Sequence, residues 1–203
     1  MNPLNSVLGT IIAGFVLAII IGASISGVQI QPLVLIRWLH VIAGITWIGL
    51  LYYFNFVQVP ALAVAMGDKE GPGGGGITKY VAPLALKWFR WAALFTWIFG
   101  AAYLLHAGNF VGAFMLGLGG ETVNSYQLII GLGAWMGTIM LFNVWVLIWP
   151  NQKKVLGIVE ASADEIAGAK RTAFLASRTN TLLSIPMLMT MVASHTSPGV
   201  LPI

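Results

Sequence analysis

The sequence predicts an all-α protein, a multi-pass transmembrane helical bundle of about five spans in one integral membrane domain, residues 1–203. The chain is 58% hydrophobic and only 8% charged, whereas soluble domains average about 25% charged residues. Several of its apolar segments reach the roughly 20 residues that a helix needs to cross a bilayer. Its basic residues gather in two loops, as they do in membrane proteins.

Five apolar segments are long enough to span. They cover about residues 7–27, 33–64, 83–106, 126–149 and 173–195. The second segment is longer than a bilayer requires, so we expect it to tilt or protrude. A glycine-rich stretch over 110–120 is too short to span and predicts an interfacial or re-entrant piece. Residues 151–177 carry charges among alanines, which predicts a cytoplasmic amphipathic connector at the membrane surface.

Lysine and arginine indicate the orientation of these spans. Of the ten basic residues, nine flank the loop between the second and third spans or the loop between the fourth and fifth: Lys69, Lys79, Lys87, Arg90, Lys153, Lys154, Lys170, Arg171 and Arg178. Only Arg37 falls on the other side. Because basic loops remain cytoplasmic, we expect the N-terminus inside and the C-terminus outside. The net charge of +4 is too small to indicate nucleic-acid binding.

The three histidines of the chain, His40, His106 and His195, all fall on the predicted outer side. Each lies near one end of a different predicted span. Ionisable side chains at membrane depth usually bind a group or relay protons. The chain has no cysteine, so a metal or haem would be held by histidine, methionine, carboxylate or backbone groups. The three histidines therefore indicate a haem-binding or metal-binding site.

The neighbours of His40 favour a haem of the b type. Gly44 lies one helical turn from His40, where a small residue lets a flat macrocycle approach, and Arg37 lies one turn away in the other direction, where it could pair with a propionate. Trp47 lies two turns away and could pack against a ring. We expect His40 to be one axial ligand and His106 or His195 the other. The alternative interpretation is structural: Arg37 then extends to the lipid headgroups, and Gly44 serves helix packing.

A copper site is the competing interpretation of the same region. Met187, Met191 and His195 follow one another at intervals of four residues, so they share one face of the last predicted span. Thioethers together with imidazole suit Cu(I). Methionine is also a common apolar filler of helical cores, and the pattern is compatible with that role.

The remaining polar and small residues of the spans have structural interpretations. Asn55, Gln58 and Asn143 are expected to make interhelical hydrogen bonds, and the pair Gly133 and Gly137 to mark a close helix contact. None of the six acidic residues lies inside a span, which disfavours an ion-coupled transporter. The sequence has no hydrolase or nucleotide-binding motif.

Two stretches of the chain resemble a known family. They are Arg37-Trp38-Leu39-His40-Val41-Ile42-Ala43-Gly44-Ile45-Thr46-Trp47-Ile48-Gly49 with Tyr52-Tyr53-Phe54-Asn55-Phe56-Val57-Gln58, and Phe142-Asn143-Val144-Trp145 with Trp149-Pro150-Asn151-Gln152-Lys153-Lys154. Both are similar to the membrane domain of the bacterial membrane-bound urate oxidase family, from about Leu33 to the last span. In that family the domain is often fused to a C-terminal c-type cytochrome, which a chain without cysteine lacks.

The resemblance implies a redox protein of the bacterial inner (plasma) membrane that passes electrons toward a periplasmic cytochrome, here a separate one. Among the site residues it carries over only His40. The alternative function is that of an accessory structural subunit of a larger respiratory or photosynthetic complex without its own chemistry. A channel for a small solute has no motif to support it. The partners expected are membrane lipid, a separate c-type cytochrome or a larger membrane complex, and no nucleic acid.

Overall fold

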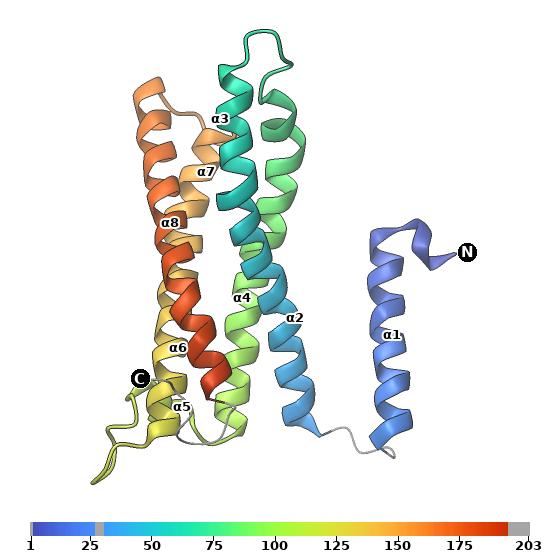
Figure 1. The fold of residues 1–203 in the computed structure, drawn as a ribbon, viewed down its shortest axis with the longest axis vertical. Coiled ribbons are helices and arrows are strands. Elements are labelled where there is room, and N and C mark those ends of the chain that lie inside the picture. Colours follow the sequence, from blue (N-terminus) through green and yellow to red (C-terminus); the bar gives the residue numbers. More distant parts are fainter. Residues whose placement is uncertain (1, 27–30, 195–203) are drawn as a thin grey trace.

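The computed structural model describes residues 2–26 and 31–194, and this part of the chain is helical with no strand (Figure 1). The α-helices are α1 Val7–Ser26, α2 Pro32–Tyr52, α3 Val59–Gly67, α4 Ala82–His106, α5 Phe110–Phe114, α6 Ser125–Phe142, α7 Trp149–Val155 and α8 Ala163–Ala193. Three π-helical turns, η2 Tyr53–Gln58, η3 Ile77–Val81 and η4 Asn143–Ile148, join some of them, and η1 Pro3–Asn5 is a 3-10 turn.

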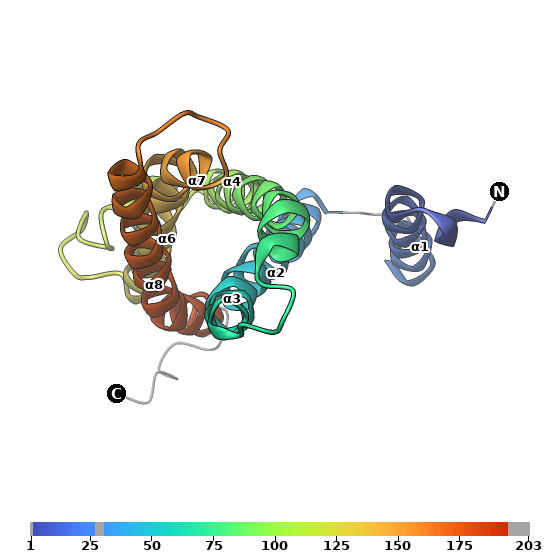
Figure 2. The same ribbon diagram turned by 90° about the horizontal axis from the view of Figure 1, so that it is seen from above.

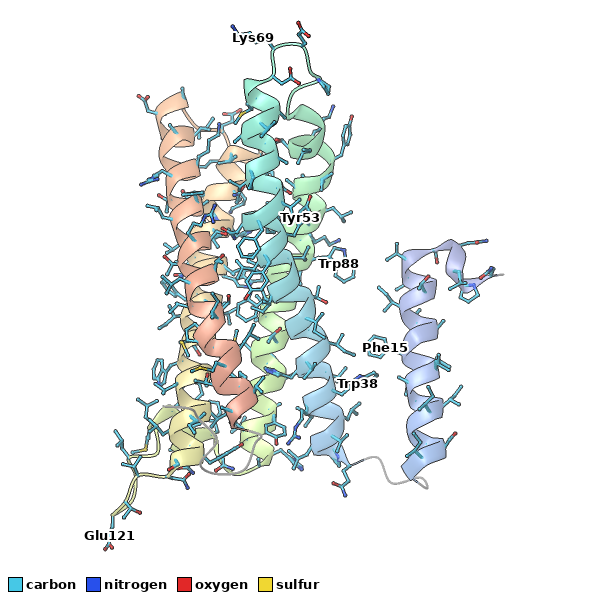
Figure 3. The ribbon with its side chains drawn as sticks, viewed as in Figure 1. Phe15, Trp38, Tyr53, Lys69, Trp88 and Glu121 are labelled. Atoms are coloured by element: carbon cyan, nitrogen blue, oxygen red, sulfur yellow. The ribbon has the colours of Figure 1, made fainter. Side chains whose placement is uncertain are left out.

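The elements after α1 form two helical hairpins. Helices α2 and α3 are continuous through η2, η3 continues into α4, and α6 and α7 are continuous through η4. The first hairpin pairs α2 and α3 with α4, and the second pairs α6 and α7 with α8 (Figures 1 and 2). Both hairpins turn at the end of the bundle that holds Lys69, and Glu121 marks the opposite end (Figure 3). We call the half of the bundle that ends at Lys69 the basic half. The half that ends at Glu121 is called the cavity half, after the cavity described below.

In the part of the chain that the structure describes, four helices are long and apolar enough to cross a membrane: Val7–Ile25, Pro32–Gly67, Ile77–His106 and Ser125–Val155. The first ends two residues before the predicted segment 7–27 does, and the other three reach several residues beyond the predicted segments 33–64, 83–106 and 126–149 at the basic end. Their length and composition indicate a membrane protein. Residues 173–193 of the fifth predicted span belong to α8, which is 31 residues long. Asp164, Glu165 and other charged residues in its first turns lower the apolar character of this helix.

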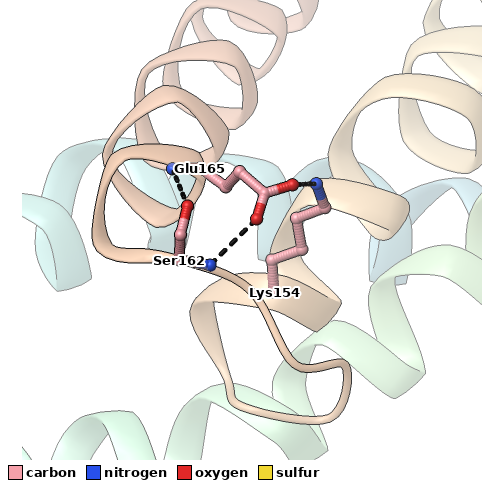
Figure 4. A network of polar contacts seen from close by, with 3 residues as sticks. All are labelled: Lys154, Ser162 and Glu165. Atoms are coloured by element: carbon pink, nitrogen blue, oxygen red, sulfur yellow. Dashed lines mark hydrogen bonds and ion pairs between the residues drawn. The ribbon is translucent and has the colours of Figure 1, made fainter.

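The structure corrects the predicted connector over residues 151–177, because these residues do not form a separate helix. Helix α7 ends at Val155, the chain turns through Gly157 in the left-handed region (φ 69°), and α8 begins at Ala163. A capping box starts α8: Ser162 Oγ accepts from the Glu165 backbone N–H at 3.3 Å, and Glu165 Oε2 accepts from the Ser162 backbone N–H at 2.9 Å (Figure 4). This helix start falls in the middle of the predicted connector.

Proline explains the three π-helical turns. Each of them ends two residues before a proline, namely Pro60 after η2, Pro83 after η3 and Pro150 after η4. A proline inside a helix has no N–H to donate, and its ring clashes with the carbonyl four residues earlier. A wider turn just before the proline relieves this clash, so the long helices continue instead of breaking. The sequence prediction did not include these turns.

The basic half and the middle of the bundle hold the main apolar core. Its largest fully buried apolar side chains include Trp47, Leu51, Phe89 and Met140. A smaller cluster of Leu104, Ala113 and Ile130 lies near the opposite end. There the short α5, within the stretch predicted as interfacial, packs closely on α6, since a Cβ at Gly131 would stand 2.1 Å from the Ala113 carbonyl oxygen.

Helix α1 lies to one side of the two hairpins (Figures 1 and 2). Its aliphatic side chains are exposed along its whole length. The Phe15 ring reaches the Trp38 ring of α2 edge-on, with 5.2 Å between the ring centroids (Figure 3).

Candidate functional site

A cavity of about 750 Å³ lies between the two hairpins in the cavity half of the bundle. This volume is within the range of about 300–1,000 Å³ that is usual for cofactor and small-molecule sites. Helices α2, α4, α6 and α8 and the end of α5 all contribute to its walls, and most of these walls are apolar. Its polar or sulfur-containing lining includes Arg37, His40, Trp47, Thr96, Tyr103, Met187 and Met191.

His40 is held in one tautomer by a neighbouring helix. Its Nδ1 lies 2.8 Å from the backbone carbonyl oxygen of Thr96 on α4. A carbonyl oxygen can only accept, so Nδ1 carries the proton and donates it to Thr96. The lone pair is then on Nε2, which is the atom that a neutral histidine offers to a metal. The half-buried ring is therefore oriented as a metal-binding imidazole would be.

Gly100 allows this ring to lie against α4. A Cβ at Gly100 would stand 3.0 Å from both Cε1 and Nδ1 of His40, closer than side chains normally approach. Other small residues extend the free space along the cavity walls: Gly44, Ala101, Ala134 and Gly137. A Cβ at Gly137 would meet no atom within 4 Å. The result is an open space beside an oriented imidazole, which suits a flat ligand.

The charged residue of the cavity lining is Arg37, which lies near the first residues of α2. The Arg37 guanidinium donates a hydrogen bond to the Tyr103 hydroxyl, and its Cζ lies 4.9 Å from the centroid of the Tyr103 ring. Arg37 is exposed, so its charge can remain solvated while it lines the cavity. A guanidinium in this position can bind a carboxylate at the rim of a bound molecule.

Trp47 lines the cavity about two helical turns from His40, on the side of the core. Its side chain is 2% exposed, and its Nε1 has no hydrogen-bond partner among the described residues. A buried donor without an acceptor is costly, above all in a membrane protein. An acceptor or a π system on a bound molecule would compensate for it.

The second hairpin contributes two methionines from α8. Met187 is buried in the main core, and Met191 packs against both this core and the smaller cluster of Leu104, Ala113 and Ile130. Gly133 of α6 makes room for Met191, because a Cβ there would stand 3.0 Å from the Met191 Cε. The expected close helix contact is thus present at Gly133, whereas its partner Gly137 lines the cavity.

The structure brings together four of the six residues predicted for the cofactor site, namely Arg37, His40, Gly44 and Trp47. It does not bring His106 to them: this residue is exposed at the end of α4 and is not among the residues that line the cavity. His195 lies outside the described residues. Within residues 2–26 and 31–194, no group of three or more histidine, cysteine or acidic side chains could hold a metal ion by itself.

The lining residues that the sequence did not identify include Thr96, Gly100 and Tyr103. Thr96 acts through its backbone carbonyl, which no sequence pattern reveals. Gly100 and Tyr103 lie four and seven residues after Thr96 on α4, so the three share one helix face. A small residue and a tyrosine on the face of a neighbouring span could have indicated this wall.

The family model described as Urate oxidase N-terminal matches residues 28–116 and 125–200, which is most of the chain. The chain belongs to this family. The resemblance inferred from the two motifs is therefore confirmed, and the chain is related to membrane-bound urate oxidase. No curated protein and no solved structure shows significant similarity to it.

Proposed function

We propose that this urate oxidase N-terminal family member is a redox protein of the bacterial inner membrane that holds a haem b in the cavity and passes electrons toward a separate c-type cytochrome. One observation carries the proposal: His40 lines the cavity with its Nδ1 2.8 Å from the Thr96 carbonyl oxygen, an arrangement in which Nε2 would be the atom that binds a metal.

The lining of the cavity fits such a group. Glycines and alanines from three helices leave space for a planar macrocycle, and Arg37 with Tyr103 can bind its carboxylates at the rim. The apolar walls would exclude water from the bound group. Because the lining includes no acidic side chain, the cavity favours a weakly charged group. Bound there, a haem would supply one-electron redox chemistry, while the protein provides binding, orientation and a low dielectric.

The proposed orientation places the cavity close to the periplasm. Nine of the ten basic residues are assigned to the cytoplasmic side by their place in the sequence. Five crossings with the N-terminus inside then put the beginning of α2 and the end of α4 at the outer surface. Electrons leaving the cavity would have a short path to a soluble periplasmic cytochrome.

The test compares two histidine variants of the full-length protein purified from a haem-replete host. Wild type is expected to show a Soret band, His40→Ala to lose it, and His106→Ala to keep it, because His106 is exposed and away from the cavity. A colourless wild-type protein would contradict the proposal. Metal analysis in the same samples separates copper from haem: copper without a Soret band would support the methionine-based interpretation with Met187 and Met191.

The second candidate function is that of an accessory subunit of a larger respiratory or photosynthetic complex. The observation that favours it is α1, whose aliphatic side chains are exposed along its length at one side of the hairpins. Helices in membranes associate through close packing, and α1 carries Gly14, Ala18 and Gly22 at intervals of four residues. Solubilisation in mild detergent tests this function, since a stable lone monomer or homo-oligomer would count against it.

A further inference from the structure

We propose that the thioether of Met191 is the second axial ligand, opposite His40, so that the bound group links the two hairpins. This inference rests on the proposed function, and it replaces His106 and His195 as the expected partners of His40. It gives haem iron a ligand on α8 that the sequence pattern considered for copper alone and that the family match does not assign.

The first support is the division of the cavity walls between the hairpins. His40 is fixed to the first hairpin, because its ring lies on α2 and its Nδ1 donates to the Thr96 carbonyl of α4. Met191 lies on α8 of the second hairpin and lines the same cavity. A group that bound His40 Nε2 and filled this cavity would therefore lie between the first hairpin and the wall that carries Met191.

The second support is the position of Met191 along the bundle axis, which is close to that of His40. Met191 packs against both hydrophobic clusters, the main core that includes Trp47 and the smaller cluster that includes Leu104. His40 lies between the same two levels, since Trp47 follows it by two helical turns and Arg37, one turn before it, contacts Tyr103 beside Leu104. Met187 is one turn deeper on α8 and belongs to the main core. Met191 is thus the thioether nearer to the level of His40.

The third support is the chemistry of the other candidates. Among the described residues, His40 is the single histidine that lines the cavity, and the lining includes no carboxylate or thiol. The neutral sulfur of methionine is a recognised axial ligand of haem iron beside histidine. The Met191 methyl group rests on Gly133 of α6, so this side chain is positioned by its neighbours.

A thioether opposite an imidazole has a measurable consequence, because it stabilises the reduced iron and raises the reduction potential relative to two histidines. The cavity would then hold a group that accepts electrons readily. The cytochrome that accepts electrons from this group would need a reduction potential at least as high as that of the group. This requirement limits the class of cytochrome that can act as partner.

The experiment compares Met191→Leu with Met187→Leu, two replacements of similar volume on one face of α8. In the first variant we expect the Soret band to remain, because His40 still binds. The long-wavelength charge-transfer band of an oxidised iron–thioether bond should disappear, and the reduction potential should fall. Met187→Leu is expected to keep the wild-type band and potential. Met191→His should keep a six-coordinate spectrum without the thioether band, at a lower potential.

The outcomes separate this inference from the proposed function. A wild-type protein with haem whose oxidised spectrum and potential are unchanged by Met191→Leu would overturn the ligand assignment and leave the haem proposal standing. Loss of the thioether band in Met187→Leu alone would overturn it in the same way. A wild-type protein without haem would overturn both proposals.

Discussion

The two halves of the bundle both bury polar side chains, but they use them differently. In the basic half the amides bond to one another and to the backbone: Asn143 Nδ2 donates to Asn180 Oδ1 at 2.8 Å, and Asn180 Nδ2 donates to the Met140 carbonyl at 3.0 Å. On the same side of Trp47, Asn55 Nδ2 donates to Ser177 Oγ at 2.8 Å. These bonds join η2, η4 and α6 to α8 and act as interhelical links, as the sequence predicted for Asn55 and Asn143.

In the cavity half the polar groups surround free space instead. His40 uses one ring nitrogen for Thr96, Arg37 lies at the rim, and the buried Nε1 of Trp47 has no partner among the described residues. The basic half has two such atoms as well, Gln58 Oε1 and Trp145 Nε1. The comparison teaches that burial of a polar residue does not by itself indicate a site. A site is indicated instead by polar groups that converge on a cavity from several helices.

The largest effect, on haem affinity, is expected from Gly100→Ala, which changes the cavity half of the bundle and leaves the basic half intact. The new Cβ would stand 3.0 Å from two atoms of the His40 ring, so the imidazole must shift slightly, and its 2.8 Å contact with the Thr96 carbonyl is expected to be disturbed. Loss of such an orienting contact typically lowers affinity for the bound metal by about 10- to 100-fold. Titration of the haem-free protein with haem, followed by absorbance, measures this loss.

The control for Gly100→Ala is Gly168→Ala on α8, a position outside the cavity lining where a Cβ meets no atom within 4 Å. This variant should bind haem as the wild type does. Equal affinities in Gly100→Ala and Gly168→Ala would show that the orientation of His40 has no part in binding.

A smaller effect, on stability and not on binding, is expected from Asn180→Ala in the basic half. Asn180 is fully buried, and its removal leaves Asn143 Nδ2 and the Met140 carbonyl without this partner. Interhelical hydrogen bonds in membranes contribute roughly 0.5–2 kcal/mol, so the unfolding temperature in detergent should fall while the haem spectrum stays the same. Thr179→Ala, whose exposed hydroxyl bonds only within its own helix, is the control. A changed haem spectrum in Asn180→Ala would mean that the two halves are not independent.

The smallest effect is expected at the basic end, in the capping box of α8. The pKa of Glu165 is lowered, first by the Ser162 backbone N–H and then by Lys154, whose Nζ lies 3.2 Å from Oε1. A lowered folded-state pKa stabilises the protein above the unfolded pKa, and this stabilisation is lost as the pH falls through the folded pKa. The unfolding temperature of wild type should therefore decline more steeply in acid than that of Glu165→Gln. Parallel curves for the two proteins would argue against a role of this carboxylate in stability.

Much of the fold could be predicted from the sequence, because apolar runs of membrane length leave few alternatives to a helix. The start of α8 could not be placed by this signal, since the capping box at Ser162 lies inside a polar segment that resembles a surface connector. Of the predicted cofactor residues, Arg37, His40, Gly44 and Trp47 line one cavity, because they share a face of α2 that periodicity predicts. What α4 contributes depends on how two helices pack.

Thr96 and Gly100 illustrate this limit. Thr96 acts through a carbonyl that every residue has, and Gly100 matters because His40 happens to lie against it. In the same way, Met187 and Met191 were considered for copper alone, because only the structure brings them to the same cavity as His40. Sequence periodicity predicts which residues share a face of a helix, but it does not predict which neighbouring helix contacts that face.

The π-helical turns before Pro60, Pro83 and Pro150 have a consequence for how relatives of this chain are aligned. Each such turn accommodates one additional residue, and one residue corresponds to about 100° of rotation around a helix axis. A relative that lacks both the proline and one nearby residue could therefore present the same face to its neighbours along the rest of the helix. Single-residue gaps close to these prolines should be accepted as genuine, since shifting them elsewhere would assign core positions to the lipid-facing side.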